Sequence, residues 1–235
     1  MVEVSEYRLE VRGIAAGRNT VRRTTRGSEV LAEADAQFTG PLGDARVKQM
    51  SRSDAAQGHS IEYRESTKDR SGEQRMEVTF DGSQGVVRMK RGSNDVAEVP
   101  YIEAFRDPLS LLRELRDADA SAERIRIPML GKTVEAHRLG ERELETPLGQ
   151  RRTRAYQLFP GGSWVWVDVE APHAIVKLTQ RTGDALVDAW LVEQTEASDM
   201  PNWDRVSSSS GGSSKKRGRR RRRRGGRSRS KKRDS

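Results

Sequence analysis

The sequence predicts an all-β, mainly antiparallel fold: a large curled sheet or open barrel of about twelve strands with one short helix on its concave side, followed by a disordered C-terminal tail. Three observations lead to this prediction. Short runs alternate apolar and polar residues, as half-buried strands do. Turns rich in glycine separate the runs, which indicates hairpins and antiparallel neighbours. A single run has helical periodicity instead.

The first strands are expected close to the N-terminus. Tyr7, Leu9 and Val11 alternate with Arg and Glu, and residues 30–38 alternate apolar with mostly acidic or amide side chains. Further alternating runs follow at residues 61–63, 76–80, 87–89 and 125–129. The last strands are denser in β-formers and cover residues 155–159, 164–169, 174–179 and 185–195. A twisted sheet of this many strands tends to curl or to split.

The single helix is expected between Asp107 and Arg116. Asp107 is a favourable N-cap, and Pro108 suits the first helical position. Four leucines fall on roughly one side of the helix, namely Leu109, Leu111, Leu112 and Leu115. Because this apolar side must be buried, we expect it to plug the concave side of a curled sheet. The alternative is two packed sheets with the helix covering an edge.

Three stretches occur in order along the body: Tyr7-x-Leu9-x-Val11-x-Gly13-Ile14-x-x-Gly17, then residues 107–116, then Trp164-Val165-Trp166-Val167-Asp168 running to Ile175-Val176-Lys177-Leu178. Together they resemble a bacterial family of β-rich proteins known only as domain of unknown function 3108. The resemblance implies a large curved antiparallel sheet around a helix, similar to the lipoprotein-carrier folds of the cell envelope, and it implies no activity. Family members are typically exported, whereas this chain starts without an apolar signal segment, and its Arg-rich tail lies outside the resemblance.

Charge is distributed unevenly along the chain. The net charge is +9, but residues 207–235 carry +13 and residues 1–206 carry −4. The composition predicts a β-rich domain over 1–206, a Ser/Gly linker over 207–214 and a disordered basic tail over 215–235. The basic residues of the tail are Lys215, Lys216, Arg217, Arg219, Arg220, Arg221, Arg222, Arg223, Arg224, Arg227, Arg229, Lys231, Lys232 and Arg233.

This tail predicts a non-enzymatic protein that associates with DNA or RNA through phosphate contacts. Guanidinium groups bind phosphate oxygens through paired hydrogen bonds and keep their charge at physiological pH. No aromatic residue lies between Lys215 and Ser235, so the tail offers no ring for base stacking and no sequence specificity. We expect a cytoplasmic protein on nucleoid or ribosomes, and a periplasmic one only if a signal peptide was removed from the native protein.

The alternative prediction is an envelope or carrier protein that binds an apolar ligand in its body and anionic lipid through its tail. A curled sheet that one helix fills incompletely leaves an apolar trough. Five aromatic residues are candidates either for the lining of this trough or for plain core: Tyr156, Phe159, Trp164, Trp166 and Trp190. The body is also a candidate surface for an unknown protein partner.

The sequence shows little that would suit an enzyme, a metal or another cofactor. Cysteine is absent, which excludes disulfides and thiolate ligands. Gly131-Lys132-Thr133 lacks the first glycine of a P-loop, which favours a β-turn. His59, His137 and His173 stand far apart, and Asp168 is the best single acid–base candidate, on a face also expected to reach solvent. No run of about 18 apolar residues predicts a transmembrane segment.

Overall fold

The computed structural model describes residues 1–92, 95–182 and 184–198. Residues Met1–Met200 form one compact unit. The end of the predicted domain, the linker over 207–214 and the basic tail over 215–235 lie outside the described residues.

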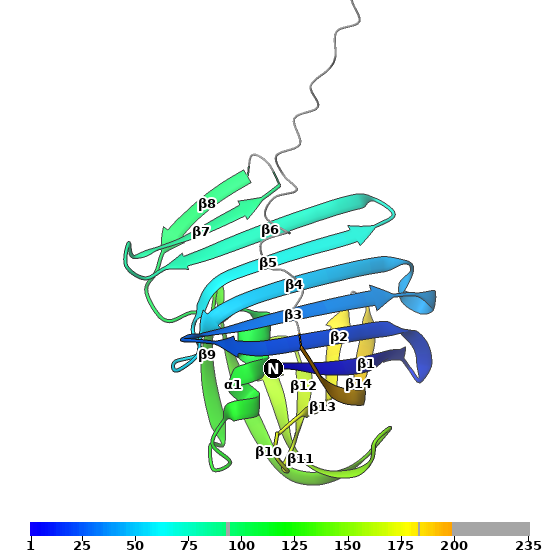
Figure 1. Cartoon of the computed structure of the whole chain (residues 1–235). Coiled ribbons are helices and arrows are strands. Elements are labelled where there is room, and N and C mark those ends of the chain that lie inside the picture. The colour runs from blue at the N-terminus through cyan, green and yellow to red at the C-terminus, as the bar shows by residue number, and fades with distance from the viewer. Residues whose placement is uncertain (93–94, 183, 199–235) are drawn as a thin grey trace, which may run out of the picture. The chain divides into compact units, whose positions relative to one another are not determined.

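The compact unit is almost entirely β-structure (Figure 1). Its strands are β1 (Val2–Val11), β2 (Ile14–Arg26), β3 (Glu29–Phe38), β4 (Ala45–Asp54), β5 (Ser60–Asp69), β6 (Gly72–Asp81), β7 (Val86–Arg91), β8 (Asp95–Pro100), β9 (Arg124–Met129), β10 (Lys132–Thr146), β11 (Gly149–Phe159), β12 (Ser163–Asp168), β13 (Ile175–Thr182) and β14 (Ala185–Ala197). A short 3-10 turn, Gly40–Leu42, precedes β4, and the helix α1 spans Pro108–Asp117.

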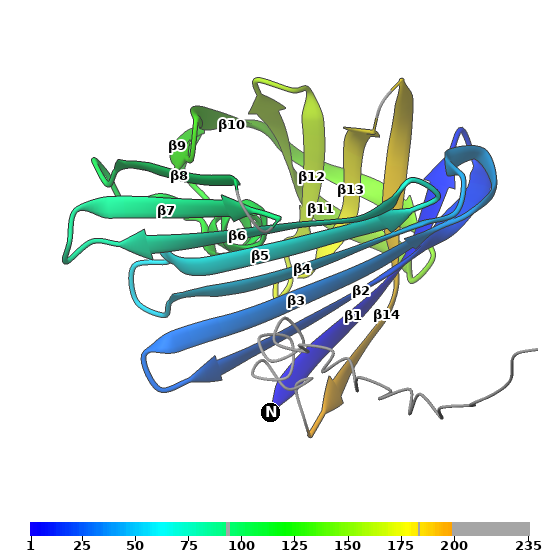
Figure 2. The ribbon, with the colours of Figure 1, turned by 90° about the horizontal axis from the view of Figure 1, so that it is seen from above.

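All strands belong to one open antiparallel sheet in the order β8-β7-β6-β5-β4-β3-β2-β1-β14-β13-β12-β11-β10-β9. The chain runs outward from β1 to β8, crosses through α1 to the opposite edge at β9, and returns to β14 beside β1. The N-terminal meander (β1–β8) and the C-terminal meander (β9–β14) therefore meet at the β1–β14 pair. Figure 2 shows the sheet curling so that the two meanders face each other.

The predicted fold class is confirmed: the strands make one continuous open sheet, and the alternative of two packed sheets is wrong. The described residues form fourteen strands, where about twelve were expected. The strands that the alternating pattern did not locate are β2, β4, β8 and β10. The predicted turn at Gly131 is also confirmed, because Gly131 has a φ of +80° in the hairpin that joins β9 to β10.

The helix begins and ends close to its predicted bounds and lies on the concave side of the sheet. Asp107 is its N-cap, with Pro108 in the first turn. Leu111 and Leu115 pack against Ile127 and other buried residues of the C-terminal meander, and Leu109 is also buried. Leu112 is only half-buried. Three of the four predicted plug leucines are thus buried core residues, and the fourth borders open space.

Polar contacts hold the helix to the N-terminal meander. At its start, the Asp107 carboxylate accepts hydrogen bonds from the hydroxyls of Ser51 on β4 (2.6 Å) and Ser60 on β5 (2.5 Å). The same carboxylate accepts from the backbone N–H groups of Leu109 and Ser110. These four bonds satisfy a fully buried charge and orient the helix across the sheet.

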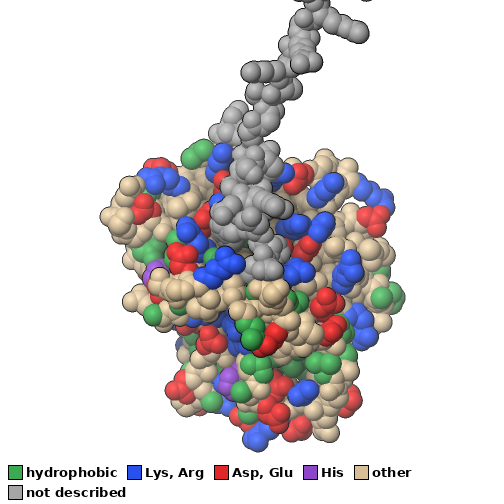
Figure 3. All heavy atoms as spheres, viewed as in Figure 1, with side chains coloured by type: hydrophobic (Ala, Val, Ile, Leu, Met, Phe, Trp, Pro, Cys, Tyr) green, Lys and Arg blue, Asp and Glu red, His purple; other side chains and the backbone are tan. Residues whose placement is uncertain are grey.

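Charged side chains on the convex face of the N-terminal meander change sign from strand to strand. β2 presents Arg18, Arg22 and Arg26, β3 presents Glu29, Glu33 and Asp35, and β4 presents Arg46, Lys48 and Arg52. Figure 3 shows Lys and Arg intermingled with Asp and Glu over this face. Cross-strand ion pairs such as Arg46 with Asp35 and Arg52 with Glu62 follow from the register.

Candidate ligand pocket

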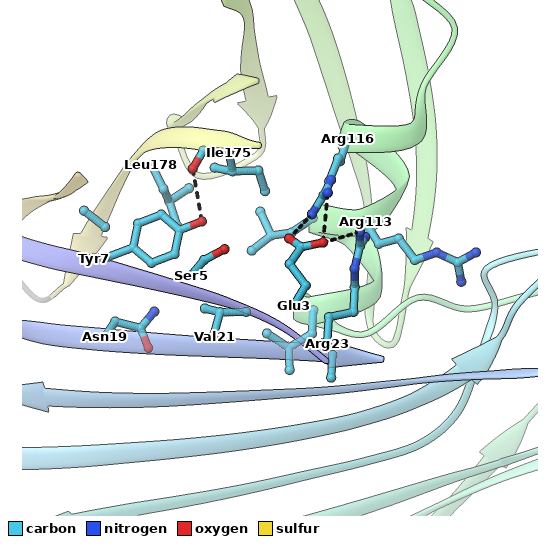
Figure 4. A pocket seen from close by; sticks show the side chains of 14 residues that line it. Glu3, Ser5, Tyr7, Asn19, Val21, Arg23, Arg113, Arg116, Ile175 and Leu178 are labelled. Carbon is cyan, nitrogen blue, oxygen red and sulfur yellow. Dashed lines mark hydrogen bonds and ion pairs between the residues drawn. The ribbon is translucent and has the colours of Figure 1, made fainter. Parts of the chain in front are cut away.

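A pocket lies between α1 and the concave side of the sheet where the two meanders meet (Figure 4). Its volume is about 80 Å³. Its lining combines residues of β1, β2, β3, α1, β13 and β14, namely Glu3, Ser5, Tyr7, Asn19, Val21, Arg23, Ala32, Leu109, Leu112, Arg113, Arg116, Ile175, Leu178 and Ala189. The pocket is therefore a product of the curl of the sheet and of the incomplete filling by one helix.

One wall of the pocket is apolar. Leu109 and Leu112 face it from the helix, and Val21 on β2 and Ile175 and Leu178 on β13 face it from the sheet. Strand periodicity explains the choice of residues, because alternate side chains of β1 and β2 point to the concave side. Burying a small apolar group against this wall is favourable at about 25 cal/mol for each Å² removed from water.

The opposite end of the pocket holds an ion-pair cluster centred on Glu3. Arg23, which is directly opposite Glu3 in the β1–β2 register, donates to the Glu3 carboxylate at 3.0 Å. Arg116 reaches both Glu3 oxygens from the last turn of α1, with its second contact at 3.0 Å. Gln194 on β14 donates to the same carboxylate at 3.1 Å. This cluster ties the C-terminal end of the helix to the β1–β14 seam.

The cluster lowers the pKa of Glu3. Burial would raise this pKa, but the hydrogen bond from Arg116 and the charges of Arg23 and Arg116 together outweigh it. Two arginines, Arg23 and Arg116, thus pair with the single carboxylate of Glu3, so this ion-pair cluster carries a net positive charge. Arg113, also in the lining, donates to the backbone carbonyls of Asp54 and Ala55 and pairs with Asp117.

Two further polar side chains line the pocket beside the apolar wall. The Tyr7 hydroxyl donates to the Ile175 carbonyl at 3.0 Å, and burial raises the pKa of Tyr7 to about 12, so the group stays protonated. The buried Oδ1 atom of Asn19 has no hydrogen-bond partner among the described residues. A buried acceptor without a partner is costly, and a donor group of a bound molecule would satisfy it.

The size and lining of the pocket limit what it can hold. An engineered apolar cavity of about 150 Å³ accommodates benzene, whereas a water needs about 10–15 Å³. A space of about 80 Å³ therefore suits a few waters or a small amphiphile, not an acyl chain.

The five aromatic residues predicted for a trough do not line this pocket. Tyr156 is fully buried in the core cluster beside the helix, and Phe159 is 40 % exposed and contacts His137. Trp164 and Trp166 alternate with the buried residues Val165 and Val167, and Trp190 alternates with Ala189 and Leu191. The three tryptophans therefore point to the convex side, because successive residues of a strand face opposite ways.

The other residues considered for acid–base or metal chemistry make hydrogen bonds and ion pairs within the sheet and its loops. Asp168 is buried instead of reaching solvent, and its carboxylate accepts from the Glu170 backbone N–H at 2.9 Å, with Arg151 at 3.7 Å. His137 contacts Glu135, and His173 contacts the Asp168 carbonyl. Within the described ranges, no three His, Asp or Glu side chains come close enough to hold a metal ion. Nor is any helix of the described residues long and apolar enough to cross a membrane.

The sequence placed Leu109 and Leu112 on the concave side, but it did not indicate the polar residues of the pocket. Glu3 and Arg116 are 113 positions apart, and nothing local in either segment signals their contact. A weak signal existed for Arg116, because an arginine in the last turn of a helix whose neighbours are buried leucines needs an acidic partner.

Comparison with known proteins gives a family and a fold. The family described as "Protein of unknown function (DUF3108)" matches residues 6–195. A solved structure from Brucella abortus, described as a beta-barrel-like protein of domain of unknown function DUF1849, is similar with a TM-score of 0.55 and 11% identity. The similarity covers 84% of this chain and 98% of that one. A search of curated proteins gives no match.

Proposed function

This chain belongs to the DUF3108 family of proteins of unknown function, and from that premise we propose that it is a non-enzymatic, nucleic-acid-associated protein. In this proposal the β-rich body is tethered to phosphate backbones by the basic tail. The family description assigns no activity, so the proposal depends on this chain's own residues.

The observation that carries the proposal is the partition of charge. Residues 207–235 carry +13, whereas residues 1–206 carry −4. Six consecutive arginines, 219–224, supply bidentate donors for phosphate oxygens. Each neutralised phosphate releases condensed counterions, which favours binding at low salt. If about seven of the tail cations engage, affinity for a duplex falls by about three to four decades between about 50 and 200 mM salt.

The test replaces Arg219–Arg224 with glutamine in the full chain. We expect binding to a labelled DNA or RNA duplex to be lost at about 100 mM salt in a gel-shift assay. The matched control removes an equal number of positive charges from exposed positions of the body. It changes Arg26, Lys90, Arg91, Lys132, Arg142 and Arg181 to glutamine. The control protein should bind as the parent does. Unchanged binding by the tail variant would refute the proposal.

The pocket supports a second candidate function, binding of a small amphiphile by a carrier or envelope protein. The specific observation is the apolar wall that ends in a cationic cluster. Titration with a short-chain carboxylate such as butyrate, followed by NMR of the pocket resonances, tests this candidate. Leu112→Trp should fill the pocket and abolish the shifts, whereas Leu148→Trp, at an exposed position, should not.

Location separates the two candidates. Recovery of the protein with nucleoid or ribosomes, and its release by nuclease, supports the first candidate. Recovery with the membrane fraction supports the second, with the tail on anionic lipid.

A further inference from the structure

On the convex face, one row of side chains departs from the alternation of charge. The register places one residue from each of eight neighbouring strands, β12 to β5, directly across from the next: Trp166, Lys177, Trp190, Arg8, Arg18, Gln37, Arg46 and Lys68. These eight residues are five cations, two indole rings and one glutamine, and the row ends at β6, where Glu73 lies directly across from Lys68. Like charges directly opposite each other, such as Arg8 with Arg18, destabilise a sheet, and a bound anion would relieve this.

At the aromatic end of the row, Lys177 contacts both tryptophan rings. The Lys177 ammonium lies 4.1 Å from the Trp190 ring centroid and 5.0 Å from that of Trp166. Trp164 extends this ladder, because its ring stacks on Trp166 at 5.9 Å. All three tryptophans are half-buried and thus keep part of their surface in contact with solvent. Rings next to cations are the combination on which single-stranded bases stack while phosphates are neutralised.

Three of the five cations in the row pair with acidic residues that lie beside the row, and these acids limit the width of the cationic strip. Arg8 pairs with Glu10, Lys177 with Asp188 and Arg46 with Asp35. Within the described part of the chain, neither Arg18 nor Lys68 has a carboxylate at ion-pair distance. Acids therefore flank a cationic line that is one residue wide. A flat anionic membrane or a thick duplex would meet those acids as well, whereas a single strand can follow the line.

We propose that this row is a binding site for single-stranded nucleic acid. The inference rests on the proposed function and deepens it: the tail supplies phosphate contacts without rings, and the row supplies rings and cations on a rigid sheet. At about 4.8 Å between neighbouring strands, the eight residues span about 34 Å. That length corresponds to roughly ten nucleotides at 3.4 Å each, within the range of known single-strand sites.

The first experiment compares a 12-nucleotide oligo(dT) with a 12-base-pair duplex, both bound to the full chain. In Arg8→Gln/Arg18→Gln/Lys68→Gln, affinity for oligo(dT) should fall at least tenfold at about 100 mM salt, and the slope of log K against log salt should drop by about 2. Duplex affinity should change as little as in the control Lys90→Gln/Arg91→Gln/Lys132→Gln, which removes three exposed charges outside the row. Equal losses in the two variants would overturn the proposal.

The second experiment tests the rings without changing the charge. Trp190→Leu should weaken oligo(dT) binding by roughly fivefold or more, and Trp190→Phe, which keeps a ring, should restore most of it. Circular dichroism and the unfolding midpoint check that both variants fold. Equal affinity of the two variants and the parent would contradict stacking at this site.

Two further arms separate the causes of failure. Vesicles that contain phosphatidylglycerol should bind the row variant and its control equally, and a specific loss for the row variant would assign the row to membranes instead. The tail variant with Arg219–Arg224 changed to glutamine should lose duplex binding but keep a residual oligo(dT) affinity that depends on Trp190. If the tail variant keeps duplex binding, the proposed function fails, and the row is still judged by its own variants.

Discussion

The two meanders of the sheet are held together by different interactions. In the C-terminal meander, Tyr156, Val165 and Val167 form an apolar core with Leu111 and Leu115 of the helix. The N-terminal meander has a smaller apolar cluster around Tyr63, Val78, Phe80 and Val87, at its far edge. Its strands β1 and β2 share another cluster with β13 and β14. Between these clusters, β3 and β4 are held mainly by backbone pairing, cross-strand ion pairs and the contacts of Asp107. One continuous sheet therefore combines a strongly packed half with a more weakly packed half.

This comparison predicts the order of local opening. Exposed ion pairs contribute about 0–1 kcal/mol each, whereas a buried leucine contributes several times more. Amide hydrogens of β10–β13 should therefore exchange more slowly than those of β2–β6.

The largest effect is expected from Leu115→Ala. Leu115 is fully buried between the helix and the C-terminal meander, and its truncation leaves a cavity. We expect a loss of about 2–5 kcal/mol in the free energy of unfolding, measured by urea denaturation. Leu148→Ala, at an exposed position, should change it by less than about 0.5 kcal/mol. Similar values for the two variants would contradict a tightly packed core around Leu115 in the C-terminal meander.

Asp107→Ala should separate the helix from the N-terminal meander. It removes the N-cap and leaves the buried hydroxyls of Ser51 and Ser60 without their acceptor. The expected loss is about 3 kcal/mol, with faster hydrogen exchange in β4 and β5 than in β11 and β12. Asp107→Asn, which keeps an acceptor for the helix N-terminus, should recover part of the loss. Uniform acceleration across the sheet would contradict this role.

Glu3→Gln should weaken the seam by about 1–2 kcal/mol at pH 7, between the values for exposed and buried pairs. The pKa of Glu3 is lower in the folded chain than in the unfolded chain. The stabilisation is therefore present above the unfolded value of about 4.3 and is lost as pH falls through the folded pKa. The difference in stability between parent and variant should shrink below about pH 4. A difference that does not depend on pH would show that the charge of Glu3 is unimportant.

The smallest effect is expected on the convex face. Arg46 hydrogen-bonds Asp35 and lowers its pKa, so Asp35→Asn should cost about 0.5–1 kcal/mol. Salt screens exposed pairs, and the cost should shrink at about 1 M salt. Asp44→Asn, whose partner Arg70 is largely exposed, serves as the control with no measurable change. A cost for Asp35→Asn above about 2 kcal/mol would place the stability of the N-terminal meander in its charges.

The parts of the fold that could be predicted are those with strong local patterns. The alternation in Tyr7–Val11 and the cap at Asp107 each carry their structural signal within a few residues. Strands such as β2 and β4 were not predicted because cations alternate there with small or polar residues. Neither face of these strands is apolar enough to show the alternating pattern.

The placement of the tryptophans shows a second limit. Alternation indicated that Trp164 and Trp166 share a face, but the intervening residues Val165 and Val167 are apolar as well. Either set could have faced the core. The choice depends on the narrow space beside the helix, which takes the valines, while the larger rings lie outside around Lys177.

The class of the fold, the single helix and the contrast between an anionic body and a basic tail follow from the sequence, because they depend on composition and on patterns over a few residues. The register that brings Glu3 to Arg116, the pocket beside them and the row of cations across eight strands arise only in the folded chain. Such features join residues that are distant in the chain. They exist only after the sheet curls and closes on its helix.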